Sequence, residues 1–284
     1  MPGAKLVLTV DVEEWFHVCG HPTYDVPERW DSFPSRVVPA TGRILDLLAR
    51  SSSRATFFVL GWVARRHPAL VREIAAAGHE LGCHGHLHRR ANTMTGQEFR
   101  ADLRAARASI EDAAGTPVVS YRAPEWSLRT TASPHLPTLV EEGFRLDSSL
   151  LAVPPIGDVA NPVRPTLLHT SAGDLLEVPP LVGTFFGQPA MLGGGWTSRL
   201  SREARVTAAA EASLARGQSP VFYLHPWEVD DEHPPMDLPP VARLVHFGGR
   251  GRVVPRLSRL LERFSSVPLG EAFPAGAFRE GVAA

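Results

Sequence analysis

The sequence predicts an α/β fold in which about seven parallel strands close into a (β/α) barrel, formed by a single domain spanning residues 1–284. Short apolar runs alternate with amphipathic helical patterns from one end of the chain to the other, and this alternation is typical of a parallel sheet with helical crossovers. Seven such runs are present, a number that favours a closed barrel over an open sheet. The segments between them contain Pro and Gly and show too little periodicity to form a second domain.

The predicted strands are apolar runs of about six residues that end at polar or turn-forming residues. They lie at residues 5–10, 55–60, 79–84, 118–124, 144–149, 175–180 and 221–226. Three insertions without a clear period are predicted to be loops, at residues 13–37, 150–173 and 181–198.

The predicted helices begin at recognisable capping residues. Thr41 is the expected N-cap of a helix that runs to Arg50, and Pro68 opens a helix that stops at Gly78. Thr95 and Glu98 have the spacing of a capping box at the start of a helix over residues 95–113. Further helices are expected at residues 133–143, 199–216, 239–246 and 255–264.

The charges of the chain nearly balance, with 29 Lys and Arg residues against 30 Asp and Glu residues. Nucleic acid and anionic membranes call for a strong basic excess, so neither is an expected partner. Cys19 and Cys83 do not form the pattern of a disulfide framework. No run reaches the ~18 apolar residues of a membrane helix, and none resembles a signal-peptide core. A cytoplasmic protein without a transmembrane segment is the expectation.

Five polar residues close five of the predicted strands. Their positions are Asp11, His84, Arg122, Asp147 and His225. Because the carboxyl ends of parallel strands meet at one rim of a barrel, we expect these side chains to converge there. Such a rim is where enzymes of this architecture carry their active sites.

A metal site is indicated by the pair His84 and His88. If this segment forms a helical turn, both imidazoles lie on one side and reach one ion. A third, carboxylate ligand would come from the segment after the first strand, which offers Asp11, Glu13 and Glu14. Zinc takes such ligands, and cobalt, nickel or iron would also accept two imidazoles and a carboxylate. Three side chains just beyond this segment are less favoured ligands: His17, Cys19 and His21.

Five segments resemble the motifs of polysaccharide deacetylases, the NodB-homology group also called carbohydrate esterase family 4. These are DVEEWF at 11–16, the two histidines at 84 and 88, Arg-x-Pro at 122–124, Asp-Ser-Ser at 147–149 and FYLHPWE at 222–228. They occur in family order, with the greatest likeness to the branch linked to exosortase-type exopolysaccharide gene clusters. The resemblance implies a distorted (β/α) barrel. It also implies an enzyme that uses a divalent metal, usually zinc, to remove acetyl groups from sugars.

The resemblance also implies roles for the residues of the first motifs. Asp11 would be the general base, and Arg122 would hold it ionised and oriented. Glu13 would be the carboxylate ligand beside His84 and His88. The commoner family pattern has two adjacent aspartates where this chain has Asp-Val-Glu, and this difference keeps the neighbouring Glu14 as a rival ligand.

In the later motifs, His225 matches the general acid, and Asp147 matches the carboxylate that stabilises its protonated form. Four residues beside the motifs are candidates for contacts with a sugar, although aromatic residues at such positions are equally typical of a core. They are Trp15, Pro124, Trp126 and Trp227.

Three functions remain open at this point. The first is a metal-dependent sugar N-deacetylase, whose substrate would be a lipid-linked or nucleotide-linked precursor or a small glycoside. The second is an allantoinase-like hydrolase of cyclic ureides or imides, because relatives of this barrel open such rings. The third is a glycan-binding barrel without activity, against which the complete set of acid, base and ligand residues argues. The sequence does not indicate the oligomeric state.

Overall fold

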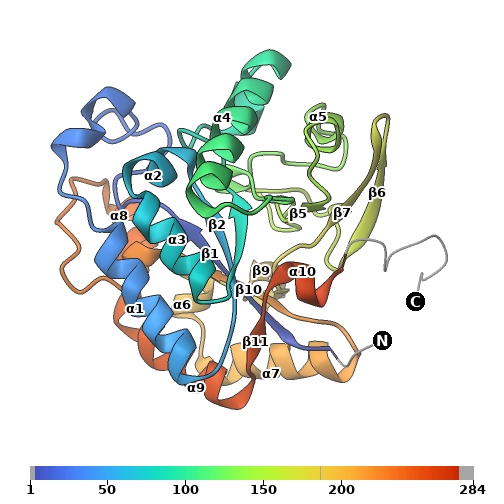
Figure 1. Ribbon diagram of the computed structural model, residues 1–284. Coiled ribbons are helices and arrows are strands. Elements are labelled where there is room, and N and C mark those ends of the chain that lie inside the picture. Colours follow the sequence, from blue (N-terminus) through green and yellow to red (C-terminus); the bar gives the residue numbers. More distant parts are fainter. Residues whose placement is uncertain (1–3, 186, 275–284) are drawn as a thin grey trace.

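The fold is built on one large sheet, which a computed structural model of the chain describes over residues 4–185 and 187–274 (Figure 1). Its strands are β1 (Leu6–Val12), β2 (Thr56–Val59), β3 (Glu80–Cys83), β4 (Ser120–Tyr121), β5 (Leu146–Asp147), β6 (Thr166–Thr170), β7 (Gly173–Glu177), β10 (Val221–Leu224) and β11 (Ser266–Val267). Along the order β10-β1-β2-β3-β4-β5-β7 every neighbouring pair is parallel, which confirms the prediction of about seven parallel strands. The short β11 pairs with the start of β1.

Three strands that form antiparallel pairs, β6, β8 (Val182–Phe185) and β9 (Gln188–Met191), lie in segments that the sequence predicts as loops. β6 pairs with β7 at one edge of the sheet, and a separate hairpin joins β8 to β9. The side chains of β6 are mostly half-buried, with no alternation between a buried and an exposed face. Such strands are stabilised by pairing with a neighbouring strand and not by a buried apolar face. The sequence therefore has no apolar run that would predict them.

The barrel closes through irregular chain rather than through a further strand. The backbone N–H of Leu181, just after β7, donates to the carbonyl of Val221 on β10 at 2.9 Å. The N–H of Tyr223 on the same strand donates to the carbonyl of Gly193 at 2.7 Å. These bonds bridge the gap between β7 and β10, so the wall continues around the structure and the barrel is distorted, as expected.

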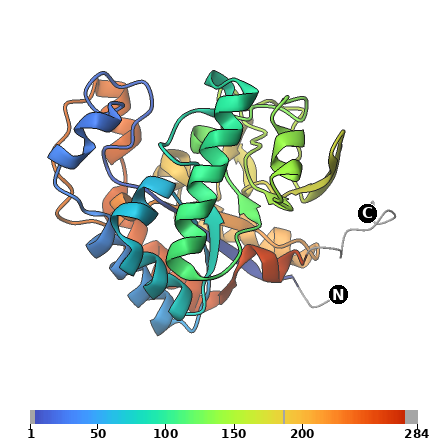
Figure 2. The same cartoon turned by 45° about the horizontal axis from the view of Figure 1, so that its top comes forward.

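Helices surround the sheet (Figure 1). They are α1 (Val37–Arg50), α2 (Gly61–Arg66), α3 (Pro68–Ala76), α4 (Gly96–Ala114), α5 (Leu136–Glu141), α6 (Gly195–Leu200), α7 (Glu203–Ala215), α8 (Pro240–Phe247), α9 (Val253–Arg263) and α10 (Leu269–Ala272). Short 3₁₀ turns are η1 (Pro27–Ser32), η2 (Ala91–Thr93), η3 (Pro124–Trp126), η4 (Pro226–Glu228) and η5 (Arg250–Arg252). Figure 2 shows α1, α3 and α4 side by side. Their apolar faces, with Ile44, Leu48, Ile74 and Leu103, are buried against strand residues such as Phe57.

Helix α1 begins at Val37 and not at Thr41, where the sequence places its N-cap. The reason is a carboxylate from a distant segment. Glu14 accepts the backbone N–H of Arg36 at 2.9 Å and that of Val37 at 3.2 Å, so the first turn has a partner for donors that a helix otherwise leaves unpaired. By contrast, the capping box of Thr95 and Glu98 forms at the start of α4 as predicted.

The predicted helix over 199–216 is two helices, since the chain is extended at Ser201 and Arg202 between α6 and α7. Helix α2, directly after β2, was not predicted because it is only six residues long.

One sheet takes strands from both halves of the chain, and β10 pairs directly with β1, so the fold is a single domain. Within the described ranges, no helix combines the length and the apolar character that a membrane crossing requires.

Candidate functional site

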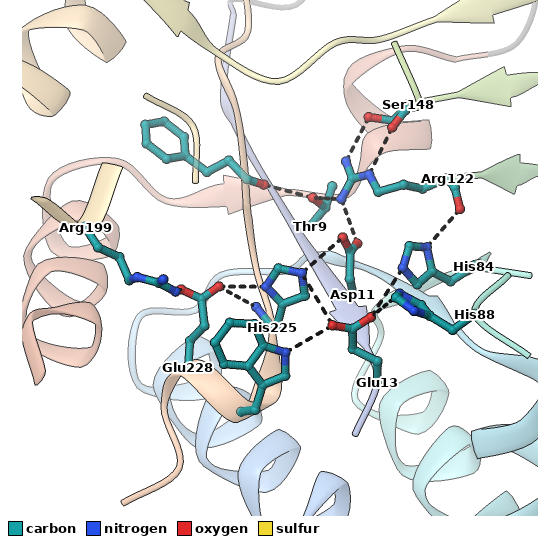
Figure 3. A network of polar contacts seen from close by, with 12 residues as sticks. Thr9, Asp11, Glu13, His84, His88, Arg122, Ser148, Arg199, His225 and Glu228 are labelled. Carbon is teal, nitrogen blue, oxygen red and sulfur yellow. Dashed lines mark hydrogen bonds and ion pairs between the residues drawn. The ribbon is translucent and has the colours of Figure 1, made fainter. Parts of the chain in front are cut away.

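Four of the five strand-end residues converge at one rim of the barrel (Figure 3). Asp11 lies near the end of β1, and His84 follows β3 directly. Arg122 follows β4, and His225 follows β10. All four are largely buried, and polar contacts connect them into one network. The fifth residue, Asp147, belongs to a different network.

Three side chains form a group that fits a metal ion. The candidate ligand atoms of Glu13, His84 and His88 all lie within 4.8 Å of one another, and all three residues are buried. Oε2 of Glu13 is 2.7 Å from Nε2 of His88 and 3.7 Å from Nε2 of His84. This oxygen is buried and receives no hydrogen bond of normal geometry from the described residues. Two imidazoles and a carboxylate are a donor set that zinc takes at catalytic sites, so the residues present fit a divalent metal.

The charge of Glu13 also suits a ligand. Burial works to raise the pKa of its carboxyl group, but the positive charges of His88 and His225 outweigh burial and hold this pKa well below its usual value. Glu13 is therefore ionised at neutral pH. Its rival Glu14 is committed elsewhere, because its carboxylate accepts hydrogen bonds from Ser35 and from the start of α1.

Both histidines have their second ring nitrogen occupied, which directs Nε2 toward the carboxylate. Nδ1 of His84 lies 2.8 Å from the carbonyl oxygen of Arg122, to which it can only donate. Nδ1 of His88 lies 3.3 Å from Sγ of Cys19, whose thiol donates to the carbonyl of His88 at 2.9 Å. Such contacts fix the tautomer and the orientation of metal-binding imidazoles.

The two histidines do not lie on a helical turn, so that prediction is wrong. The chain from His84 to Arg90 is irregular, and His88 has a left-handed backbone with φ of 52°. This loop is held by α2, whose Gly61 N–H donates to the carbonyl of Gly85 at 2.9 Å. Any larger residue at 61 would place its Cβ 2.4 Å from a ring nitrogen of His86, so the close approach requires glycine.

Arg122 fixes Asp11, as the sequence predicts. Nη1 of the buried guanidinium lies 2.8 Å from Oδ1 of Asp11 and also donates to Oγ1 of Thr9. Its other nitrogens donate to the backbone carbonyl and the hydroxyl of Ser148. The ion pair leaves Oδ2 of Asp11 facing Nε2 of His225 at 3.9 Å.

The carboxylate beside His225 is Glu228 and not Asp147, so that prediction is wrong. Oε1 of Glu228 lies 2.7 Å from Nδ1 of His225, and its other oxygen pairs with Arg199 on α6. Burial works to raise the pKa of Glu228, but Arg199 and His225 lower it to about 2. Burial works to lower the pKa of His225, but the charges of Glu13, Glu228 and Asp11 outweigh burial and raise this pKa.

Asp147 instead belongs to a buried pair of carboxyl groups with Glu177 at the end of β7. The hydroxyl of Ser149 donates to Asp147, and the N–H of Leu150 donates to Glu177 at 3.1 Å. Burial raises the pKa of Asp147 to about 6, and burial together with the charge of Asp147 raises that of Glu177 well above its usual value. At neutral pH the pair therefore holds a proton on Glu177, in the wall of the barrel.

The four residues expected to contact a sugar have other surroundings. Trp15 is only 4% exposed and packs with Phe16 and Tyr24, so it is a core residue and that prediction is wrong. Pro124 and Trp126 are buried. Trp227 is half-buried and donates its indole N–H to Oε1 of Glu13 at 3.0 Å.

Two further residues of the site, Glu228 and Arg199, were not predicted from the sequence. Glu228 stands three residues after His225, behind a proline that opens the 3₁₀ turn η4. This spacing is the signal that could have identified it, because a tight turn brings positions i and i+3 together. Arg199 has no such local signal, since it approaches Glu228 from a different helix.

Two family models match the chain. Residues 28–135 match the model described as polysaccharide deacetylase, and residues 148–273 match a domain of unknown function, DUF3473. The metal-binding candidates His84 and His88 lie in the first match, and His225 lies in the second. The candidate site thus takes residues from both matches, and Asp11 and Glu13 precede the first.

Individual relatives agree with the first match. Over 91 residues the chain is 31% identical to a peptidoglycan-N-acetylglucosamine deacetylase of Bacillus cereus, an alignment that covers 30% of this chain and 42% of that protein. The chain thus matches less than half the length of this relative.

Similar solved structures include a protein from Mycobacterium smegmatis assigned as a polysaccharide deacetylase, with a TM-score of 0.59 and 24% identity over 93% of this chain and 92% of that one. A PuuE allantoinase gives a TM-score of 0.58 with 18% identity over 93% of this chain and 85% of that one. At these identities the two structures support the fold alone. The match over residues 28–135 shows that this part of the chain is similar to polysaccharide deacetylases.

Proposed function

We propose that this protein is a metal-dependent hydrolase that removes acetyl groups from N-acetylated sugars. The observation that carries the proposal is the position of His225, whose Nε2 lies 3.9 Å from Asp11 and 3.7 Å from Glu13. A candidate base, a candidate acid and the metal-binding group thus share one rim. The names of the relatives, which include a peptidoglycan-N-acetylglucosamine deacetylase, support a sugar amide as the substrate class.

We propose zinc as the metal, held by Glu13, His84 and His88. A bound zinc ion would supply Lewis acidity, which polarises an amide carbonyl and makes water easier to deprotonate. The protein contributes the arrangement of its ligands, since both histidines and the carboxylate are fixed by contacts with other residues. Cobalt, nickel or iron would accept the same donor set.

Asp11 is proposed as the general base. Its ion pair with Arg122 fixes the carboxylate and leaves Oδ2 turned toward the centre of the site. A carboxylate in this position can accept a proton from the water that attacks the acetyl carbonyl.

His225 is proposed as the general acid. An amine cannot leave as an anion, so the nitrogen of the sugar must receive a proton as the C–N bond breaks. Glu228 accepts a hydrogen bond from Nδ1 of His225, which leaves Nε2 as the proton donor at the rim. Because Glu228 is itself held charged by Arg199, the protonated form of His225 is favoured.

An allantoinase-like hydrolase remains a second candidate, because the fold is as similar to a PuuE allantoinase as to the Mycobacterium smegmatis protein. Release of acetate from N-acetylglucosamine oligomers and from lipid-linked or nucleotide-linked acetylated sugars would be compared with ring opening of allantoin and succinimide. The proposal expects acetate release that a chelator abolishes and zinc restores. Ring opening without acetate release would favour the second candidate, and inactivity on both panels would contradict both.

A further inference from the structure

The indole of Trp227 contacts both halves of the proposed machinery. Its N–H donates to Oε1 of Glu13 at 3.0 Å, and its ring stacks on the imidazole of His225 with centroids 4.9 Å apart and planes 19° apart. One side chain thus touches the metal-binding carboxylate and the candidate acid. Trp227 lies two residues after His225 on the turn η4, which accounts for the stacking.

The hydrogen bond decides which oxygen of Glu13 faces the histidines. Oε1 accepts the indole N–H, and Oε2 is left to face Nε2 of His88 at 2.7 Å. His225 competes for the same carboxylate, because its Nε2 is 3.7 Å from Oε1. Without the indole N–H, the carboxylate of Glu13 is free to turn toward His225 and away from His84 and His88. Contacts behind a metal ligand of this kind orient it and affect metal affinity.

The indole is itself held by residues from two other helices. The imidazole of His246, near the end of α8, stacks on it with centroids 4.1 Å apart and planes 11° apart. The guanidinium of Arg199, on α6, lies over the ring at 5.6 Å. Nε2 of His246 in turn lies 2.9 Å from Nε2 of His233. With two imidazoles and a guanidinium against it, the ring is occupied by protein groups rather than open as a platform for a pyranose.

We infer that Trp227 is a positioning residue that holds Glu13 in the orientation needed for metal binding and holds His225 in the orientation needed to donate its proton. The inference deepens the proposed function and rests on it for the role of His225. The role toward Glu13 can be tested without any substrate. The positioning role replaces the expectation that Trp227 binds sugar directly.

The test is the variant Trp227→Phe, which keeps an aromatic ring for stacking and removes the N–H donor together with the second ring of the indole. Zinc affinity is measured on the metal-free protein by competition with a chromogenic chelator. We expect the affinity to fall by about 10- to 100-fold, the usual effect of removing a contact behind a ligand. Trp196→Phe is the matched control, because Trp196 is 38% exposed and makes no such contact with Glu13. Its zinc affinity should equal that of the unaltered protein.

A second variant keeps the inference testable if Trp227→Phe does not fold. His246→Leu leaves the indole N–H in place and removes the imidazole stacked on it, so zinc affinity should fall by a smaller factor than in Trp227→Phe. Kinetics on an acetylated glucosamine oligomer should show a lower kcat and an unchanged KM for Trp227→Phe. Unchanged zinc affinity in the folded variants, or a raised KM with unchanged kcat, would overturn the inference. Because zinc affinity needs no substrate, a failure of the deacetylase proposal itself would be recognised separately, by absence of acetate release from the unaltered protein.

Discussion

Oε1 of Glu228 lies 2.7 Å from Nδ1 of His225, and this contact assigns the partner of the candidate acid. The carboxylate comes from the same 3₁₀ turn as the histidine, and Arg199 on a separate helix keeps it charged. The strand-end carboxylate Asp147, which would suit this role by its position in the sequence, lies in a buried pair with Glu177 instead.

Removal of the charge of Glu228 should change the pH dependence of turnover. The negative charge of Glu228 helps to raise the pKa of His225, and the acid works only while it is protonated. Activity is therefore lost as the pH rises through this pKa. In Glu228→Gln the pKa falls, so the loss on the basic side should move to lower pH by about 1 to 3 units. Asp147→Asn is the control, and the basic side of its profile of kcat against pH should stay in place.

Loss of His225 should affect turnover and spare the metal. General acid catalysis contributes about 10²- to 10⁴-fold to a rate, so kcat of His225→Ala should fall by about that factor. Metal content, measured by mass spectrometry of the purified variant, should match that of the unaltered protein because His225 is not among the three grouped ligands. A variant with normal turnover would remove His225 from the mechanism.

Adjacent glutamates should give opposite results. Glu13→Ala should lose the metal and all acetate release, since Glu13 supplies the carboxylate of the ligand group. Glu14→Ala should keep the metal, but it should lower the free energy of unfolding by about 0.5–2 kcal/mol, because α1 loses the carboxylate at its N-terminus. Metal analysis and denaturant unfolding of the two variants provide the measurements. Loss of metal from Glu14→Ala alone would reverse the assignment.

The buried pair of Asp147 and Glu177 should make the free energy of unfolding depend on pH. Both carboxyl groups have a raised pKa in the folded state, so the fold binds protons that the unfolded chain has released. Stability is therefore fully present at low pH and declines as the pH rises from about 4 through the raised pKa values, about 6 for Asp147.

Glu177→Gln should remove part of this decline of the free energy of unfolding with rising pH, since an amide can donate to Asp147 without carrying a charge. Urea unfolding at pH 5 and pH 8 measures how much free energy of unfolding is lost between the two pH values. This loss should be smaller in the variant, by on the order of 2 kcal/mol. An equal difference in both proteins would show that the pair does not take up the protons.

The sequence predicts the arrangement of the site where that arrangement follows from strand geometry. Asp11, His84, Arg122 and His225 stand at the ends of parallel strands, and parallel strands end at one rim. The approach of Glu13 to His84 follows from the same geometry, because the two residues directly follow β1 and β3.

Features that depend on contacts between distant segments were not predictable in this way. The left-handed backbone of His88 is held by a loop that α2 supports, and the start of α1 depends on Glu14 from another loop. The surroundings of Trp15 are decided by packing, because a tryptophan beside a motif fits a core and a substrate pocket equally well in sequence.

The central claim is that Glu13, His84 and His88 bind one divalent metal ion at the rim that also holds Asp11 and His225. The most direct test is an anomalous difference map, recorded at the zinc absorption edge, from crystals of the protein grown with zinc. We expect one strong peak about 2.0–2.1 Å from Nε2 of both histidines and from an oxygen of Glu13. A map with no peak between these three side chains, or with its strongest peak on other residues, would contradict the account.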